Sequence, residues 1–306
     1  MKVLERNCQT RCTPVVWARA LSLTMLAIPA CGGDSTGPAS HPPQIAFMSN
    51  RQGPQSDIYL MNADGSHVVN LTNNSVFDYA PAWSPGGTKI AFYSTRDANA
   101  EVYVMNADGT AQTRVTNNAA EDLEPAWSPD GKKLAFASAR DGNWEVYVMN
   151  ADGTAQTRVT NNAAEDLGPA WSPDGTKLAF SSNRDGGWEV YVMSADGSAQ
   201  TRLSNTAMAA HVVPTWSPNG QKIAFESDRD GNWEIYVMNA DGSAQTRLTD
   251  NGATDGGPAW SPDGQQIAFV SARDGNYEVY VMNADGTSPT RITNDPAFDT
   301  YPRWRP

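Results

Sequence analysis

A period of 44 to 45 residues runs through this chain and constrains its fold more than any other feature. The stretch EVYVMNADGTAQTRVTNNAAEDL occurs at 101–123 and again at 145–167 without a substitution. The same unit recurs less strictly, with an IAF or LAF triplet whose Phe stands at Phe47, Phe92, Phe136, Phe180, Phe225 and Phe269. A Trp that follows Pro-X marks the same copies at Trp83, Trp127, Trp171, Trp216, Trp260 and Trp304. Self-similarity at such a period is typical of architectures in which each unit buries its apolar faces against its neighbours.

Each unit contains four short segments with strand composition, separated by turn sequences. In one copy these segments are 125–127, 133–138, 145–150 and 157–161, with Ser-Pro-Asp-Gly after the first and Asn-Ala-Asp-Gly after the third. The segment EVYVMN is apolar on both faces, so its sheet must be covered on both sides. No segment has a sustained helical period, and we therefore expect no long helix.

Four-stranded sheets packed face to face around a ring satisfy this pattern. A linear stack would instead need atypical capping repeats, and the six units over 44–306 show none. The repeat begins in the second strand of a unit, at Gln44–Ser49, and finishes in a first strand, at Tyr301–Trp304. We therefore predict an all-β, six-bladed β-propeller of four-stranded antiparallel blades over 44–306. In this prediction the C-terminal strand joins and completes the N-terminal blade.

The first 43 residues have a different composition. Four basic residues precede the apolar run Ala20–Ala30, and this run is shorter than the about 20 residues that span a bilayer. The ending Ile28-Pro29-Ala30-Cys31 resembles a bacterial lipobox. We expect a signal peptide of the lipoprotein type over 1–30, lipidation of Cys31 and a flexible tether over 31–43. An ordinary signal peptide cleaved nearby is the alternative.

Composition excludes several classes of function. The formal net charge of −12 opposes binding to nucleic acid or to an anionic membrane surface. All three cysteines lie in the first 31 residues, and the chain has only three histidines. We therefore expect no metal site, no cofactor and no thiol nucleophile in the repeat region.

The unit AWSPDGxKIAFxSxRDGxWEVYVMNADG resembles the WD40-like (PD40) repeat of the TolB-like propeller family. The resemblance covers all six copies over 44–306 and implies a propeller of the periplasm or of the secreted fraction. TolB also has an α/β domain before its propeller, and we expect only the propeller part here. The resemblance further implies work in an envelope complex, as TolB itself does with a peptidoglycan-associated lipoprotein.

Two charged positions recur in every unit, on either side of one hairpin. The basic position is occupied by Arg51, Arg96, Arg140, Arg184, Arg229 and Arg273. The acidic position is occupied by Asp57, Glu101, Glu145, Glu189, Glu234 and Glu278. Because both flank the same hairpin, we predict a cross-strand ion pair in each blade with a structural role.

Another recurring position lies three residues before the Pro of the loop between blades. It is occupied by Asp78, Asp122, Asp166, His211, Asp255 and Asp299, which we call the ring residues. We expect them to circle the mouth of the central channel, where an acidic ring would attract a cation, a sugar or a basic peptide. The alternative is that each Asp binds backbone N–H groups of its own loop.

Aromatic residues are distributed unevenly at the same end of the ring. Immediately before the hairpin Glu stand Trp144, Trp188, Trp233 and Tyr277, whereas the first two units have Ser56 and Ala100. Phe77, Tyr79, Phe298 and Tyr301 lie in the loops beside the first blade. Aromatic side chains at a rim suit contact with a sugar or a peptide. The alternative is that each aromatic side chain covers the aliphatic part of the recurring Arg side chain or packs against the next blade.

These observations predict a non-catalytic protein-binding, ligand-binding or scaffolding propeller lipoprotein of the bacterial cell envelope. We expect an exported monomer, periplasmic or associated with the outer membrane, which meets the membrane only through its N-terminal lipid. The expected partner is an envelope protein or peptide, or a glycan. The alternative function is a propeller-type lyase or hydrolase that acts on a glycan or small substrate at the channel mouth. A third possibility is recognition of the opposite, turn-rich face within a larger assembly.

Overall fold

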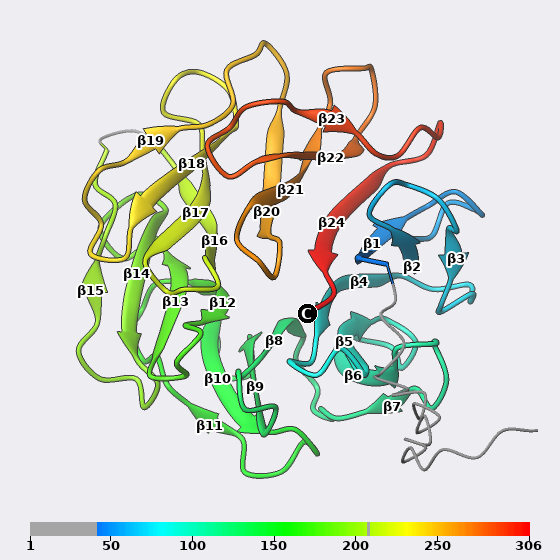
Figure 1. Ribbon diagram of the computed structural model, residues 1–306. Helices are drawn as coiled ribbons and strands as arrows, with labels where there is room; N and C mark the ends of the chain where they lie inside the picture. The colour runs from blue at the N-terminus through cyan, green and yellow to red at the C-terminus, as the bar shows by residue number, and fades with distance from the viewer. Residues whose placement is uncertain (1–41, 207–208) are drawn as a thin grey trace, which may run out of the picture. The chain divides into compact units, whose positions relative to one another are not determined.

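The computed structural model describes residues 42–206 and 209–306, which form 24 β-strands. They make six four-stranded antiparallel sheets arranged around a common centre (Figure 1). The predicted fold class is therefore confirmed. The predictions for the signal peptide, for Cys31 and for nearly all of the tether lie outside the described residues. The described part of the chain holds no helix that is long and apolar enough to cross a membrane.

Each blade is a sheet whose strands follow the chain from the centre outwards. The innermost strands are β4 (Asp78–Trp83), β8 (Asp122–Trp127), β12 (Asp166–Trp171), β16 (His211–Trp216), β20 (Asp255–Trp260) and β24 (Asp299–Trp304). The second strands are β1 (Gln44–Ser49), β5 (Lys89–Ser94), β9 (Lys133–Ser138), β13 (Lys177–Ser182), β17 (Lys222–Ser227) and β21 (Gln266–Ser271). The third strands are β2 (Asp57–Asn62), β6 (Glu101–Asn106), β10 (Glu145–Asn150), β14 (Glu189–Ser194), β18 (Glu234–Asn239) and β22 (Glu278–Asn283). The short outer strands are β3 (Val69–Asn70), β7 (Thr113–Arg114), β11 (Thr157–Arg158), β15 (Thr201–Arg202), β19 (Thr246–Arg247) and β23 (Thr290–Arg291).

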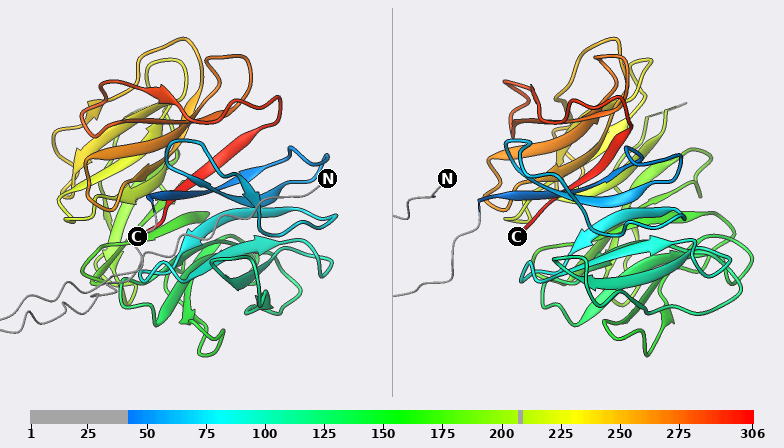
Figure 2. Two further views of the ribbon diagram at one scale, coloured as in Figure 1. Left: turned by 45° about the vertical axis from the view of Figure 1, so that its right-hand side comes forward. Right: turned by 90° about the vertical axis from the view of Figure 1, so that its right-hand side faces the viewer.

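The first blade is assembled from both ends of the repeat region, in the order β24-β1-β2-β3. The second to sixth blades are β4–β7, β8–β11, β12–β15, β16–β19 and β20–β23. In the first blade β24 pairs antiparallel with β1, so that Trp304 lies opposite Ile45 and Asp299 opposite Ser49. This pairing confirms the predicted closure. The turned views in Figure 2 show β24 beside β1 from two further directions.

The core lies between successive blades, because the third strands are apolar on both faces. Val102 and Val104 of the second blade pack against Phe136, Tyr147 and Met149 of the third. Within every blade, the Phe of the second strand also packs against the Tyr of the third strand, with 5.6–5.7 Å between the two aromatic ring centroids. The prediction that both faces of each sheet must be covered is confirmed.

Turns close each blade at the end of the ring that faces the viewer in Figure 1. In the Asn-Ala-Asp-Gly turn, Gly153 has a φ of 88° and donates its N–H to the carbonyl of Asn150 at 2.9 Å. A Cβ at this position would come within 2.2 Å of the carbonyl oxygen of Val115 in the blade before. Only Gly fits there, both for its positive φ and for the close approach of the neighbouring blade.

Candidate functional site

The six ring residues occupy equivalent positions, each the first residue of an innermost strand. None of them is exposed to solvent: all six have a relative accessibility of 0%. Each donates its backbone N–H to the carbonyl of the residue that precedes the hairpin Asp or Glu in the previous blade, as Asp166 does to Trp144 at 2.8 Å. The structure therefore brings the predicted ring residues and the predicted aromatic positions together, with the ring residues beneath the surface.

Five of the six ring residues are carboxylates that bind an Arg of their own blade. Arg140 Nη2 lies 2.9 Å from Asp122 Oδ2, and Asn118 Nδ2 donates to the same oxygen at 2.6 Å. Equivalent Arg–Asp pairs join Arg51 to Asp299, Arg96 to Asp78, Arg184 to Asp166 and Arg273 to Asp255. A buried carboxylate is stable only when it is paired and hydrogen-bonded, so these contacts explain why the position can be charged.

The predicted ion pair between this Arg and the hairpin Glu is wrong. The Arg side chain crosses the aromatic pair of its own blade toward the innermost strand, with Arg140 Cζ 4.5 Å from the ring centroid of Tyr147. In four blades the hairpin carboxylate instead binds a second Arg on the outer strand, as Glu145 Oε1 does with Arg158 Nη2 at 2.5 Å. Both Args belong to one blade, and the sequence pattern alone does not show which strand each side chain crosses.

His211 takes the place of the carboxylate in the fifth blade. Its Nδ1 lies 3.2 Å from Arg229 Nη2, so it accepts a hydrogen bond from the guanidinium and the proton of the neutral ring lies on Nε2. That nitrogen is 3.7 Å from Glu189 Oε2. Burial, followed by the charge of Arg229, lowers the pKa of His211 to about 4. The imidazole of His211 is therefore neutral at pH 7 and keeps the hydrogen bond from Arg229.

The predicted aromatic positions lie at the surface above the ring residues. Trp144, Trp188 and Trp233 are half-buried, and Tyr277 is 37% exposed. Tyr277 contacts Phe298 edge to face at 5.8 Å between centroids. On the other side of the first blade Phe77 stacks on Tyr79 at 5.7 Å. We call the four side chains Phe77, Tyr79, Tyr277 and Phe298 the rim patch.

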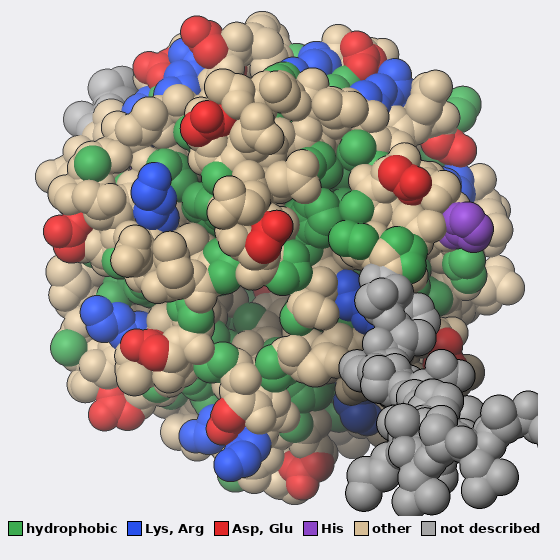
Figure 3. Space-filling view, viewed as in Figure 1, with side chains coloured by type: hydrophobic (Ala, Val, Ile, Leu, Met, Phe, Trp, Pro, Cys, Tyr) green, Lys and Arg blue, Asp and Glu red, His purple; other side chains and the backbone are tan. Residues whose placement is uncertain are grey.

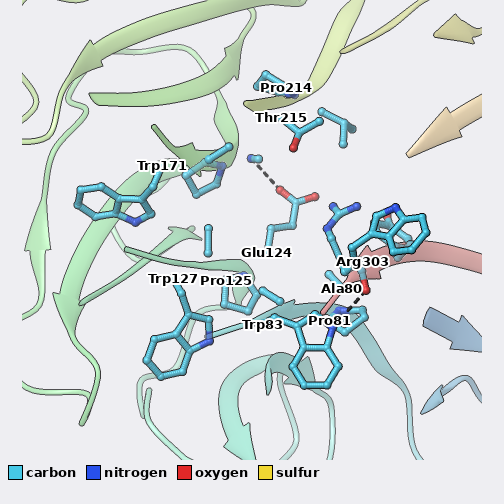
Figure 4. Close-up of a pocket in the computed structure, with 18 residues that line it drawn as sticks. Ala80, Pro81, Trp83, Glu124, Pro125, Trp127, Trp171, Pro214, Thr215 and Arg303 are labelled. Atoms are coloured by element: carbon cyan, nitrogen blue, oxygen red, sulfur yellow. Dashed lines mark hydrogen bonds between the residues drawn. The ribbon is translucent and has the colours of Figure 1, made fainter. Parts of the chain in front are cut away.

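A cavity of about 280 Å³ lies in the central channel, and the ring residues do not line it. Its walls come from residues further along the innermost strands, including the Pro and Trp of several blades (Figure 4). Figure 3 shows the turn-bearing face, which is hollowed at its centre. The prediction placed the ring residues around the channel mouth, whereas the residues that face the cavity begin two positions later.

The third residue of every innermost strand adopts a left-handed backbone conformation at the channel wall. These residues are Ala80, Glu124, Gly168, Val213, Gly257 and Tyr301, with φ between 50° and 63°. The position coincides with the irregularity in register between the first and second strands of each blade. Only two of the six are Gly, and a β-branched residue such as Val213 is strained in this conformation.

Three charged side chains in the channel region were not predicted. Glu124 and Arg303 line the cavity, and Glu226 lies close enough for Arg303 and Glu124 to influence its charge state. Burial raises the pKa of Glu124 and raises that of Glu226 to about 7. Burial lowers the pKa of Arg303. Comparing the six copies column by column reveals them, because Arg303 stands where four other copies have Ala.

No three His, Cys, Asp or Glu side chains come together as a metal site within residues 42–206 and 209–306. The contacts of the ring residues are ion pairs and hydrogen bonds within the scaffold. Binding of a ligand through these residues, and through Trp144, Trp188, Trp233 and Tyr277, stays a prediction. A ligand that contacted the ring carboxylates would first have to displace the Args that cover them.

Comparison with known proteins identifies the repeat. A family model described as the TolB beta propeller domain matches residues 22–124, 111–211 and 205–306. The crystal structure of TolB from Acinetobacter baumannii is similar, with a TM-score of 0.77 and 23% identity over 86% of this chain and 67% of that chain. A TolB candidate from Agrobacterium tumefaciens has a TM-score of 0.71 and 23% identity over 87% of this chain and 100% of that chain. These two structures show the shared fold.

A curated relative gives a closer match over a short segment. The protein TolB homolog of Chlorobaculum tepidum is 45% identical over 49 residues. This segment is 16% of this chain and 11% of that protein, so most of the relative's length has no counterpart in the match.

Proposed function

The chain belongs to the TolB β-propeller family, and we propose that it is a non-catalytic binding propeller of the bacterial cell envelope. Its partner is an envelope protein that docks on the rim patch. In this proposal the chain is exported, and acylated Cys31 holds it at the periplasmic or outer-membrane surface. The propeller itself serves as a rigid platform and acts as a monomer toward the partner.

The observation that carries this proposal is the exposure of the rim patch. Phe77, Tyr277 and Phe298 are 38%, 37% and 50% exposed, among only five large apolar side chains of the described residues with such exposure. All three belong to the loop end of the ring and flank the first blade, where Phe298 N donates to Asn50 Oδ1 at 2.8 Å. Aromatic side chains are enriched in protein interfaces and give large contact areas at low entropic cost.

The ring residues support this surface from below. The ion pairs and backbone hydrogen bonds of Asp78 and Asp299 fix the start of the two innermost strands that follow Phe77 and Phe298. Side chains on rigid elements bind a partner with less loss of conformational entropy than side chains on free loops. In this proposal the ring residues position the rim patch, and the aromatic residues make the contact.

Cross-linking in the native envelope, followed by identification of the attached proteins, tests the proposal. The double variant Phe77→Ser/Phe298→Ser should lose the specific cross-links while it keeps the melting temperature of the wild type. Val69→Ser is the matched control, because Val69 is 53% exposed but lies on the outer strand β3. Unchanged cross-links in the double variant, or an equal loss in the control, would refute docking at the rim patch.

A further inference from the structure

The central channel breaks the symmetry of the six blades with three charged side chains. Before the Trp of the innermost strand, four blades have Ala and one has Thr215, but the first blade has Arg303. At the left-handed position Glu124 replaces the small or uncharged residues of the other blades. On the second strand Glu226 stands where the other blades have Met48, Tyr93, Ala137, Ser181 and Val270. The other blades form without these charges, so the scaffold does not require them.

Arg303 differs from the Args that stabilise the blades. Its Nη1 donates to the carbonyl of Pro302 at 2.9 Å, within its own strand. Within residues 42–206 and 209–306 it forms no ion pair with a carboxylate, in contrast to the Args paired with ring residues. Figure 4 shows its side chain directed into the channel, on the same side as that of Glu124. A guanidinium has five N–H donors in a planar fork that matches a carboxylate, and most of these donors remain for a ligand.

The two carboxyl groups are held in place by the neighbouring blades. Gly168 N donates to Glu124 Oε2 at 2.8 Å, and Gly257 N donates to Glu226 Oε1 at 2.5 Å. Each side chain therefore uses one oxygen to bind the backbone of the next blade and keeps the other for a further donor. The charge of Arg303 acts on both groups and opposes the effect of burial on their pKa values.

We propose that the channel binds a small zwitterion of amino-acid size. Its carboxylate binds the guanidinium of Arg303, and its ammonium group binds the carboxyl group of Glu124, the two charged side chains that line the cavity. Glu226 adds a further carboxyl group near both of them. An anion alone would meet a carboxyl group, and a cation alone would meet the guanidinium, whereas a zwitterion matches both signs. A cavity of about 280 Å³ lies just below the usual range of small-molecule sites, which corresponds to a ligand of few heavy atoms.

This site is separate from the rim patch, and the inference goes beyond the proposed function. Burying a charged group of a ligand costs little free energy only where the site offers a hydrogen-bonding partner of opposite charge. The mixed charge of the channel therefore also determines which ligands it rejects. Acetate and ethylammonium each carry one half of the charge pattern of alanine. Both should bind at least about tenfold more weakly than a zwitterion that fits the channel, because one set of channel charges would stay unmatched.

Isothermal titration of the folded protein with alanine, 4-aminobutyrate, acetate and ethylammonium tests the inference. The two zwitterions differ in the separation of their charges, so that at least one should bind saturably. Arg303→Ala and Glu124→Gly introduce residues that other blades already have at these positions, and both should fold and bind at least about tenfold more weakly. Absence of saturable binding for both zwitterions, equal binding of acetate, or unchanged binding by Arg303→Ala would overturn the inference. Phe77→Ser/Phe298→Ser should bind the zwitterion normally, which separates this result from the test of the rim patch.

Discussion

The guanidinium of Arg305 lies over the indole ring of Trp83, with Cζ 5.1 Å from the ring centroid. The same residue donates its backbone N–H to Gln44 O at 2.8 Å and its Nε to Gly87 O at 2.9 Å. Arg305 therefore joins the end of the innermost strand of the first blade to the second blade. The closure of the ring depends on this residue as well as on the ladder between β24 and β1.

Arg305→Ala should lower the melting temperature by about 2–5 °C, because it removes a cation–π contact and side-chain hydrogen bonds. Deletion of Thr300–Pro306 should lower it much further, since one blade then loses its innermost strand. Thermal unfolding followed by circular dichroism measures both changes. Lys89→Ala, at an exposed position of β5, is the control and should leave the transition unchanged.

Asp166→Asn should destabilise the protein by about 2–3 kcal/mol. The substitution keeps the shape of a fully buried side chain but removes the charge that pairs with Arg184 Nη2 at 3.0 Å. Chemical denaturation measures the change in the free energy of unfolding. Asp152→Asn is the control, since Asp152 lies in an exposed turn and Asn can also accept from Thr154 N. Equal stability of Asp166→Asn and the wild type would contradict a structural role of the ring residues.

Val213→Gly should raise the melting temperature by about 1–4 °C. Val213 has a φ of 54°, a conformation that costs a β-branched residue more than the chain entropy that Gly loses on folding. Differential scanning calorimetry measures the shift. The neighbouring Val212 has no positive φ, so Val212→Gly should lower the melting temperature. A decrease for both variants would show that the left-handed position carries no relievable strain.

Glu226 should make the protein less stable as the pH rises. Its pKa is raised to about 7 in the folded state from a reference value of 4.5, so the folded state binds more protons between these values. The stabilisation is complete below pH 4.5 and is lost as the pH rises through 7. Glu226→Gln keeps an oxygen for the N–H of Gly257 and does not titrate. Relative to the wild type, its melting temperature should therefore be higher at pH 8 than at pH 5, and an equal difference at both values would contradict the raised pKa.

His211 should have the opposite dependence. Its pKa is lowered to about 4 in the folded state from 6.5, so the unfolded state binds more protons between these values. The stabilisation is present above pH 6.5 and is lost as the pH falls toward 4. The charged groups around it are Arg229, Arg202, Glu189 and Asp228. In His211→Asn the melting temperature should fall less than in the wild type between pH 7 and pH 4.5, and a parallel fall would contradict the lowered pKa.

Much of the fold follows directly from the repeat. The positions of Phe47 and Trp304 within the repeat show that the repeat region begins with a second strand and finishes with a first strand. This arrangement predicts that both belong to one blade, and the pairing of β24 with β1 confirms it. The two apolar faces of EVYVMN likewise predict the packing of each blade against both neighbours. These features could be predicted because strand periodicity and turn chemistry are local properties of the sequence.

The polar contacts could not be predicted to the same degree. Arg140 is closer in sequence to Glu145 than to Asp122, yet it pairs with Asp122, because the choice depends on which way a long side chain crosses the sheet. The recurring pattern of the unit also gives no indication of Arg303 and Glu226, because both depart from it. Their significance appears only when the ring places both side chains in the channel region.

The hydrogen bond between Arg305 N and Gln44 O, at 2.8 Å, brings the first and last residues of the propeller together. A peptide linker across this point would make the ring continuous, and the chain could then be opened in the turn between the first and second strands of any other blade. Five circularly permuted proteins and the natural chain would thus share one structure, each with a different blade assembled from both chain ends. Which blade is completed last during folding is therefore a matter of connectivity, and engineering can change it while the packing of the ring stays the same.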